Sequence, residues 1–280
     1  MLKGLLLVAF FFYAAAAGLA LAYLGSRDER LPRWMLALLG VGAFFHSGSL
    51  CSLVREFWAI PANRWFFPIA SLHGVLSWLA FTNAMVFLVL EAVGRLGILG
   101  AFVLPWTILA TGAALLMESH AAPLAQDLRS YWLNTHPLVL MVAYTGFMNA
   151  VGVGIALLVQ ERQIKSRKPS ELCYRLPALE ELDRLHLSTL AFSWPVLTLG
   201  MAMGAVWSKA AFGRLWSWSS KETLSLLVWL AYGGLLAAHR FLGVRGRRSV
   251  LWGMAAFALV LLTLFGSTHG APPAPAAPLP

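Results

Sequence analysis

The sequence is poor in charged residues and in cysteine, and each shortage excludes a class of protein. Charged residues make up 12% of the 280-residue chain, whereas a soluble domain carries roughly 25%. A soluble globular enzyme and a disordered chain are therefore excluded. The two cysteines, Cys51 and Cys173, lie far apart and form no C-x-x-C motif. Neither a disulfide-rich secreted scaffold nor a thiol–disulfide carrier is expected from such a chain.

Apolar residues are abundant instead, and they occur in long runs. Hydrophobic residues make up 59% of the chain, and the mean hydropathy is +0.72. Because a bilayer core requires about 20 apolar residues per helix, the fold class is predicted to be all-α, a polytopic membrane protein. Its eight transmembrane helices are expected at about 4–25, 34–54, 67–91, 97–117, 136–160, 187–207, 221–242 and 250–267.

The first span ends in Ala20-Leu21-Ala22, which resembles the cleavage site of a signal peptide. Its apolar run is longer than the apolar region of a typical signal peptide, so a retained helix is the preferred interpretation. Residues 1–270 are predicted to form a single transmembrane domain. The Pro/Ala-rich segment 271–280 is predicted to be a disordered tail, because such a composition builds no core.

The 21 Lys and Arg residues divide 14 to 7 between the two ends of the spans, and the larger group follows spans one, three, five and seven. Cytoplasmic loops are enriched in these residues, so both termini are predicted to face the outer, periplasmic side. The net charge of +9 is then explained by topology and contact with anionic lipid, and no nucleic acid is expected as a partner. The loop 161–186, which holds His186, is placed in the cytoplasm, and its segment 176–183 resembles a short amphipathic helix.

The outer loop of about 207–223, between the sixth and seventh spans, is rich in tryptophan. It holds Trp207, Trp216 and Trp218 and ends in Lys221-Glu222-Thr223. One interpretation is an interfacial aromatic belt, since Trp favours the headgroup region. The other is a surface for a large planar ligand, built from flat indoles and a few polar groups. The loop alone does not choose between them.

The histidines add to the second interpretation. His136 opens the fifth span and His269 follows the eighth, so both lie at the end that holds the tryptophan-rich loop. Two imidazoles beside aromatic rings suit bis-histidine ligation of haem. His46 lies inside the second span and His239 in the inner half of the seventh. A single histidine inside a span is often only a hydrogen-bonded side chain. A zinc site would need acidic or cysteine ligands at a suitable spacing, and a proton relay would need carboxylates within the spans. The sequence does not provide these partners.

The segment Trp216-Ser217-Trp218-Ser219-Ser220-Lys221-Glu222-Thr223 resembles the tryptophan-rich WWD loop of the CcsA/ResC family of cytochrome c assembly proteins, Trp-x-Trp-Asp-Pro-Lys-Glu-Thr. The flanking segments 192–200 and 204–207 are similar too, as is Ala237-Ala238-His239-Arg240. Three segments depart from the family, and one of them is Asn63-Arg64-Trp65-Phe66-Phe67-Pro68, where the family has a Gly-His-x-Pro-like segment. Ser219-Ser220 replaces Asp-Pro, and Ala70-Ser71-Leu72-His73-Gly74 replaces an Asn-Leu-Tyr-Glu-Ser-like stretch.

The resemblance implies a haem-handling subunit of a holocytochrome c synthase in the bacterial cytoplasmic (inner) membrane. Such a protein binds haem b without a covalent bond and presents it on the outer face for attachment to apocytochrome c. A ResB/CcsB-type membrane subunit and a thiol-reducing pathway are the implied partners. The implied iron ligands are His46 and His239 within the membrane and His136 and His269 at the outer face, with Trp207, Trp216 and Trp218 walling the porphyrin.

Several alternatives remain open at this point. Lys209, Arg214 and Lys221 pair with haem propionates in one interpretation and are ordinary juxtamembrane charges in the other. His73 and His120 are possible replacement ligands. A HemX-like regulatory or scaffolding protein that binds haem without attaching it is the alternative function, and a transporter with an aromatic lining is the third.

Overall fold

The computed structural model describes residues 2–26, 28–69, 71–94, 97–119, 123–124, 131–166 and 170–265. Within these residues all regular secondary structure is helical, and eight helices are long and apolar enough to cross a membrane. This confirms the predicted all-α fold with eight spans. The helices are α1 (Leu2–Gly25), α2 (Arg30–Trp58), η1 (Pro61–Asn63), α3 (Leu72–Gly94), η2 (Gly97–Leu99), α4 (Gly100–Leu116), α5 (Tyr131–Lys165), α6 (Glu171–Arg175), α7 (Leu179–Phe212), α8 (Ser220–Leu242) and α9 (Arg247–Phe265).

Several predicted boundaries differ from the structure: α2 and α5 extend four to five positions beyond their predicted spans at both ends, and the starts of the third and sixth spans were wrong. The third span begins at Leu72 and not at residue 67, because the segment that contains Pro68 is an irregular connection. The sixth span begins at Leu179, eight positions before the prediction, so the expected amphipathic helix and the span are one continuous helix. His186, which was placed in a cytoplasmic loop, is therefore inside α7 and is 1% exposed.

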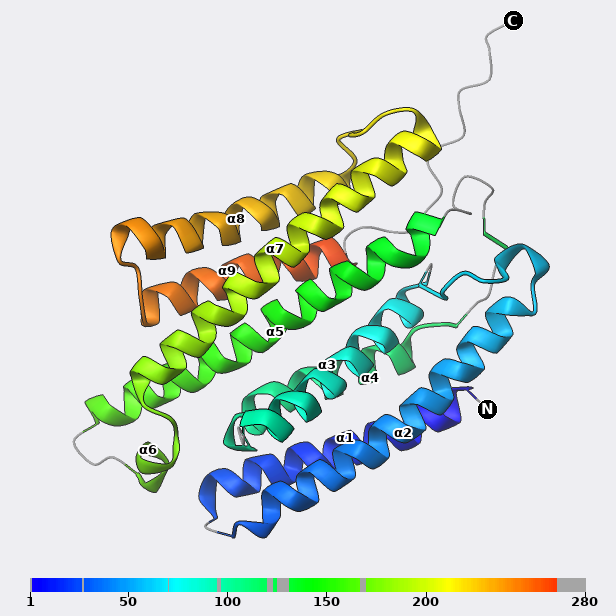
Figure 1. Cartoon of the computed structure of the whole chain (residues 1–280). Coiled ribbons are helices and arrows are strands. Elements are labelled where there is room, and N and C mark those ends of the chain that lie inside the picture. The colour runs from blue at the N-terminus through cyan, green and yellow to red at the C-terminus, as the bar shows by residue number, and fades with distance from the viewer. Residues whose placement is uncertain are drawn as a thin grey trace, which may run out of the picture.

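The helices form two groups that pack side by side (Figure 1). One group holds α1 to α4, with α1 lying against α2 and α4 and with α3 against α4. The other holds α5, α7, α8 and α9, with α5 packed along α7 and α9. The core of the second group includes Phe147 of α5 stacked on Tyr232 of α8, with ring centroids 3.9 Å apart. Contacts of α5 with α3 and α4 join the two groups.

Small residues allow α5 and α7 to approach closely along much of their length. A Cβ atom added at Gly146 would lie 1.9 Å from Ser193 Oγ, and one at Gly200 would lie 2.5 Å from a methyl group of Leu140. Neither position has space for a side chain. Close backbone approach at small residues is the usual means of helix association in a bilayer, where lipid competes for apolar contacts.

A buried polar cluster links the two groups. Asn149 Nδ2 of α5 donates to Asn83 Oδ1 of α3 at 2.8 Å, and Asn83 Nδ2 donates to Thr107 Oγ1 of α4 at 2.9 Å. All three side chains are at most 5% exposed. Hydrogen bonds of this kind across helices are worth about 0.6–2 kcal/mol each in membranes, and they also fix the register between helices.

One end of the bundle gathers the segments that carry the predicted outer site. Figure 1 shows the α2–α3 connection, the start of α5 and the α7–α8 loop at the same end. The helix order therefore places these three segments together, as the alternating topology requires. That this end faces outward, and that residues 1–270 form one domain, stay predictions. The predicted tail 271–280 lies outside the described residues.

Candidate functional site

The imidazole of His136 is fixed against α7 by a backbone hydrogen bond and by glycine. Its Nδ1 lies 2.9 Å from the carbonyl oxygen of Gly200. Because a carbonyl only accepts, Nδ1 must carry the hydrogen, and Nε2 of the neutral ring keeps its lone pair. A histidine that binds a metal through Nε2 commonly donates its other N–H to a backbone carbonyl in this way. The structure thus holds His136 in the tautomer that an iron ligand requires.

Gly204, one helical turn after Gly200, provides the space for this ring. A Cβ atom at position 204 would lie 2.9 Å from His136 Cε1 and 3.2 Å from its Nδ1. The His136 ring therefore lies directly on the α7 backbone, which fixes its plane as well as its hydrogen bond. Sequence reasoning missed both glycines, although their four-residue spacing is the signal that predicts close helix approach.

The tryptophan-rich loop is held in shape by Ser219 and Glu222. Ser219 is the N-cap of α8, and its side chain accepts a hydrogen bond from the Glu222 backbone while Glu222 bonds back to the Ser219 N–H. The Glu222 carboxylate also accepts from Ser217 N at 2.8 Å and from Ser217 Oγ at 2.7 Å. This reciprocal arrangement is a capping box, so the serine form of the motif caps the helix.

The three predicted tryptophans differ in their surroundings. Trp216 and Trp218 pack edge to face with centroids 6.0 Å apart, and Trp218 is 70% exposed. Trp207 packs on Phe212 at 5.5 Å. The indole N–H groups of Trp207 and Trp216 are buried and have no hydrogen-bond partner in the described structure. Because a buried N–H without an acceptor is costly, these two donors fit a ligand that brings its own acceptors.

Cations accompany these rings. Lys221 lies at the start of α8, partly buried, and close enough to His136 for their charges to interact. Lys209 in the last turn of α7 and Arg214 in the α7–α8 connection are exposed. The site therefore combines an imidazole with a free lone pair, unpartnered indole donors and a net positive charge. That combination suits an aromatic, anionic molecule that also offers a metal centre.

His269, the predicted partner of His136, lies outside the described residues, as does His120. The last described residue of α9 is Phe265, four positions before His269. The structure thus gives the geometry of one member of the outer pair.

The predicted inner pair is not brought together. His46 is fully buried between α1, α2 and α3, with Nδ1 3.2 Å from the Tyr13 hydroxyl and Nε2 2.9 Å from Ser77 Oγ. His239 lies in the last turn of α8, where its Nδ1 donates to the Val244 carbonyl at 3.0 Å. Because α2 packs on α1 and α3 while α8 packs on α7 and α9, the two imidazoles belong to different helix groups.

Two further histidines resemble His136 in their bonding. His73 Nδ1 donates to the Ala114 carbonyl at 2.8 Å, and His186 Nδ1 donates to the Ala150 carbonyl at 2.8 Å. In each ring Nε2 is buried without a hydrogen-bond partner. His73, which was left open as a replacement ligand, thus has the tautomer of a ligand but lies inside the α1–α4 group.

The fold and this site together define a class: a multi-pass membrane protein with a histidine and tryptophan site at one end of its bundle. The family model described as cytochrome C assembly protein matches residues 69–270. The chain therefore belongs to the family of cytochrome c assembly proteins.

Curated relatives agree with this assignment. The chain is 30% identical over 232 residues to the cytochrome c biogenesis protein CcsA of Synechococcus sp. (strain CC9902), which covers 72% of this chain and 76% of the relative. It is 29% identical over 230 residues to CcsA of Guillardia theta, with 74% and 76% covered. For CcsA of Parasynechococcus marenigrum the identity is 28% over 290 residues, with 85% and 94% covered.

A solved structure with the same fold is the cytochrome c haem lyase CcmF. The TM-score is 0.70 at 18% identity, and the match covers 94% of this chain. The chain spans 46% of the length of that protein. At this identity the likeness shows the arrangement of the helices.

Proposed function

We propose that the protein binds haem at the outer end of its bundle and presents it for covalent attachment to apocytochrome c. His136 and His269 are the axial ligands in this proposal, and Trp207, Trp216 and Trp218 wall the porphyrin. The observation that carries it is the hydrogen bond from His136 Nδ1 to the Gly200 carbonyl, which leaves Nε2 free to bind iron. Family membership supports the same conclusion.

The residues present fit haem as a cargo. The Trp207 and Trp216 indole N–H groups lack acceptors, and the haem propionates supply them. Lys221 beside His136, with Lys209 and Arg214 nearby in the chain, offers charge-assisted donors to the same carboxylates.

In this proposal the protein positions the reactants, and the reacting groups belong to haem and to the apocytochrome thiols. Each thioether forms when a thiol S–H of an apocytochrome Cys-x-x-Cys-His adds across a vinyl double bond, so the bond count balances without an oxidant or a leaving group. Holding both groups in contact converts a bimolecular addition into an effectively unimolecular one. The exposed ring of Trp218 provides a surface on which the incoming peptide rests.

The inner pair, His46 and His239, is proposed as a second haem site with weaker support. His46 Nε2 is hydrogen bonded to Ser77 Oγ, so that bond must break before the nitrogen binds iron. His239 has Nδ1 engaged with Val244 and Nε2 available. A haem held by both residues would also require α2 and α8 to share a surface that the described packing does not give them.

Location and partners complete the proposal. The protein is placed in the bacterial cytoplasmic membrane with both termini outside, haem b is its non-covalent cargo, and a ResB/CcsB-type subunit is its membrane partner. The described cysteines, Cys51 and Cys173, are free and lie in different parts of the fold. Reduction of the apocytochrome thiols therefore falls to a separate thiol-reducing pathway.

Absorption spectra of the purified protein test the outer site. The wild type, as isolated and after dithionite, is expected to show six-coordinate haem, and His136→Ala and His269→Ala are each expected to lose or change that spectrum. His186→Ala is the matched control, because His186 is also packed between α5 and α7 through a backbone carbonyl but at the opposite end. Unchanged spectra in both outer variants, with an inserted and folded protein, would refute the assignment.

Haem attachment separates the two remaining functions. Co-expression with an apocytochrome that carries Cys-x-x-Cys-His is expected to yield covalent haem on the cytochrome, and His136→Ala is expected to abolish it. Haem-loaded protein with no covalent product, in the presence of its membrane partner, would favour the HemX-like regulatory or scaffolding role instead.

A further inference from the structure

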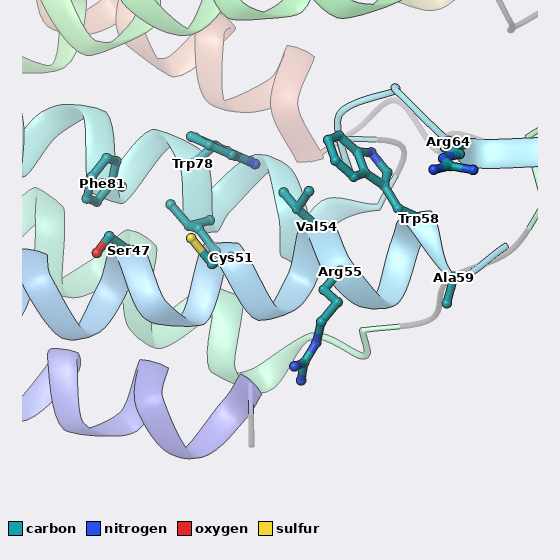
Figure 2. A pocket seen from close by; sticks show the side chains of 10 residues that line it. Ser47, Cys51, Val54, Arg55, Trp58, Ala59, Arg64, Trp78 and Phe81 are labelled. Atoms are coloured by element: carbon teal, nitrogen blue, oxygen red, sulfur yellow. The ribbon is translucent and has the colours of Figure 1, made fainter. Parts of the chain in front are cut away.

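A cavity lies between α2 and α3, and its Trp58 end is at the same end of the bundle as the histidine and tryptophan site. It has a volume of about 660 Å³ and is walled by Leu50, Val54, Trp78 and Phe81. Ser47, Cys51, Arg55 and Arg64 add polar atoms to its lining. Figure 2 shows Ser47 and Phe81 toward one end of this α2–α3 cleft and Trp58 and Arg64 toward the other. The cleft is therefore apolar along its length and cationic at one end.

The length of the cleft matches one leaflet of a bilayer. Its α2 wall runs from Ser47 to Trp58, a distance of about 16 Å at 1.5 Å per residue. Half of a hydrocarbon core is about 15 Å. Trp58 at the helix end is 39% exposed and lies where an indole meets the headgroup region. Ser47 then lies near the middle of the membrane, so the cleft extends from the headgroups to the ends of the lipid chains.

The charged end of the cleft has cations without acidic partners among the described residues. Within the described part of the chain, neither Arg55 nor Arg64 forms an ion pair, and Arg64 lies 5.5 Å from the Trp65 ring. In Figure 2 the Arg55 side chain extends to the side of α2 opposite Trp78, whereas Arg64 lies beyond Trp58 at the same end of the cleft. Arg64 at the headgroup level complements a phosphate, which a guanidinium group binds through several N–H donors.

A third polar group faces the same space. Trp78 Nε1 is buried and has no hydrogen-bond partner, and in Figure 2 it lies on the side of the ring that faces Trp58. An ester carbonyl just below a phosphate is an acceptor at this depth. The described lining holds no histidine, so the cleft offers no imidazole to haem iron. These features favour a lipid as the occupant.

We propose that the α2–α3 cleft binds an anionic phospholipid, with an acyl chain along Leu50, Val54 and Phe81 and the phosphate at Arg64. The bound lipid fills the space beside the α2–α3 contact in which His46 meets Ser77 at 2.9 Å. It therefore stabilises the packing of α2 on α3. The proposal is independent of haem binding at the outer site.

Cys51 makes the proposal measurable, because it lines the cleft and is an exposed free thiol. In a Cys173→Ser background Cys51 is the single thiol, and the Gln160 bond to Cys173, which uses the backbone carbonyl, is kept. The probe is N-ethylmaleimide, an uncharged reagent that an anionic surface does not repel. Its reaction with Cys51 is timed in nanodiscs of phosphatidylglycerol and of phosphatidylcholine.

A bound anionic lipid is expected to slow the reaction roughly tenfold in phosphatidylglycerol, the protection given by a site that is nine-tenths occupied. Arg55→Gln with Arg64→Gln is expected to remove the difference between the two lipids. The control, Arg245→Gln with Arg248→Gln, makes the same change in net charge at exposed positions of the α8–α9 connection and the first turn of α9 and should keep the protection.

Three outcomes would overturn the proposal. The first is an equal reaction rate in both lipids with the arginines intact, a comparison that does not depend on the folding of any arginine variant. The second is protection that persists in the Arg55→Gln, Arg64→Gln protein. The third is protection by added haemin in phosphatidylcholine nanodiscs, which would assign the cleft to a porphyrin.

Discussion

Gly204→Ala places a methyl group against the proposed iron ligand. The new Cβ atom would lie 2.9 Å from His136 Cε1 and 3.2 Å from Nδ1, whereas carbon atoms pack best at about 3.5–4.0 Å. The imidazole must therefore move by roughly 0.6 Å. A shift of that size along the hydrogen bond would stretch the 2.9 Å contact to Gly200 to about 3.5 Å, beyond the usual limit for an N–H···O bond.

The expected effect on haem is larger than the effect on folding. Overpacking costs about 1–3 kcal/mol, and the lost hydrogen bond adds about 0.5–1.5 kcal/mol. Metal ligands tolerate displacements of only about 0.5 Å, and loss of the bond that orients a ligating histidine typically costs 10–100-fold in affinity. We therefore expect Gly204→Ala to bind haem about 10–100-fold more weakly while it still inserts and folds.

Haemin titration and thermal unfolding of the detergent-purified protein measure the two effects separately. Gly146→Ala is the matched control, because its Cβ would strain the same α5–α7 contact at Ser193 without touching His136. It should lower the melting temperature and leave haem affinity unchanged. Haem affinity and spectrum in Gly204→Ala equal to those of the wild type would show that this packing does not position a ligand.

Three further predictions concern the loop and the buried polar cluster. Ser219→Ala removes the N-cap of α8 and should cost about 0.5–2 kcal/mol in thermal unfolding, whereas Ser219→Asp should keep the cap; equal losses would contradict this. Trp207→Phe combined with Trp216→Phe removes two unpartnered N–H donors, so haem retention should fall severalfold without loss of stability. Asn149→Leu leaves Asn83 Oδ1 without its donor and should destabilise by about 1–3 kcal/mol, and adding Asn83→Leu should recover part of that loss.

The sequence was sufficient to predict the membrane spans, because apolar length is a direct physical requirement of the bilayer. The predicted boundary was wrong where a helix extends beyond its apolar run. In α7, Glu180 and Glu181 end the hydropathy signal, yet acidic residues favour the first turn of a helix, and the helix begins at Leu179. Position in the hydropathy profile therefore misplaced His186, which packs between glycines of α5 and α9.

For the candidate site, the sequence predicted which types of side chain are present but not how they are packed. His136 and the tryptophans stand out by type and by topology, which a sequence shows directly. The support of the His136 ring by Gly200 and Gly204 depends on the rotation of α7 against α5, and a sequence does not give that angle. The same limit explains the inner pair. His46 and His239 both lie inside apolar spans, but a position within a span says nothing about which helices are neighbours.

With Ser219 in place of the aspartate of the family motif, the loop keeps its helix cap but loses a negative charge. Ser and Asp are about equally good N-caps, and here Ser219 forms the full capping box with Glu222. The Glu222 carboxylate already accepts hydrogen bonds from the backbone N–H groups of Ser217 and Ser219. An aspartate at position 219 would add a second carboxylate beside it, whereas serine leaves Lys221 and the exposed Lys209 and Arg214 with less acidic competition. Since opposite charge stabilises a bound carboxylate, the substitution favours an anionic cargo at this end of the bundle.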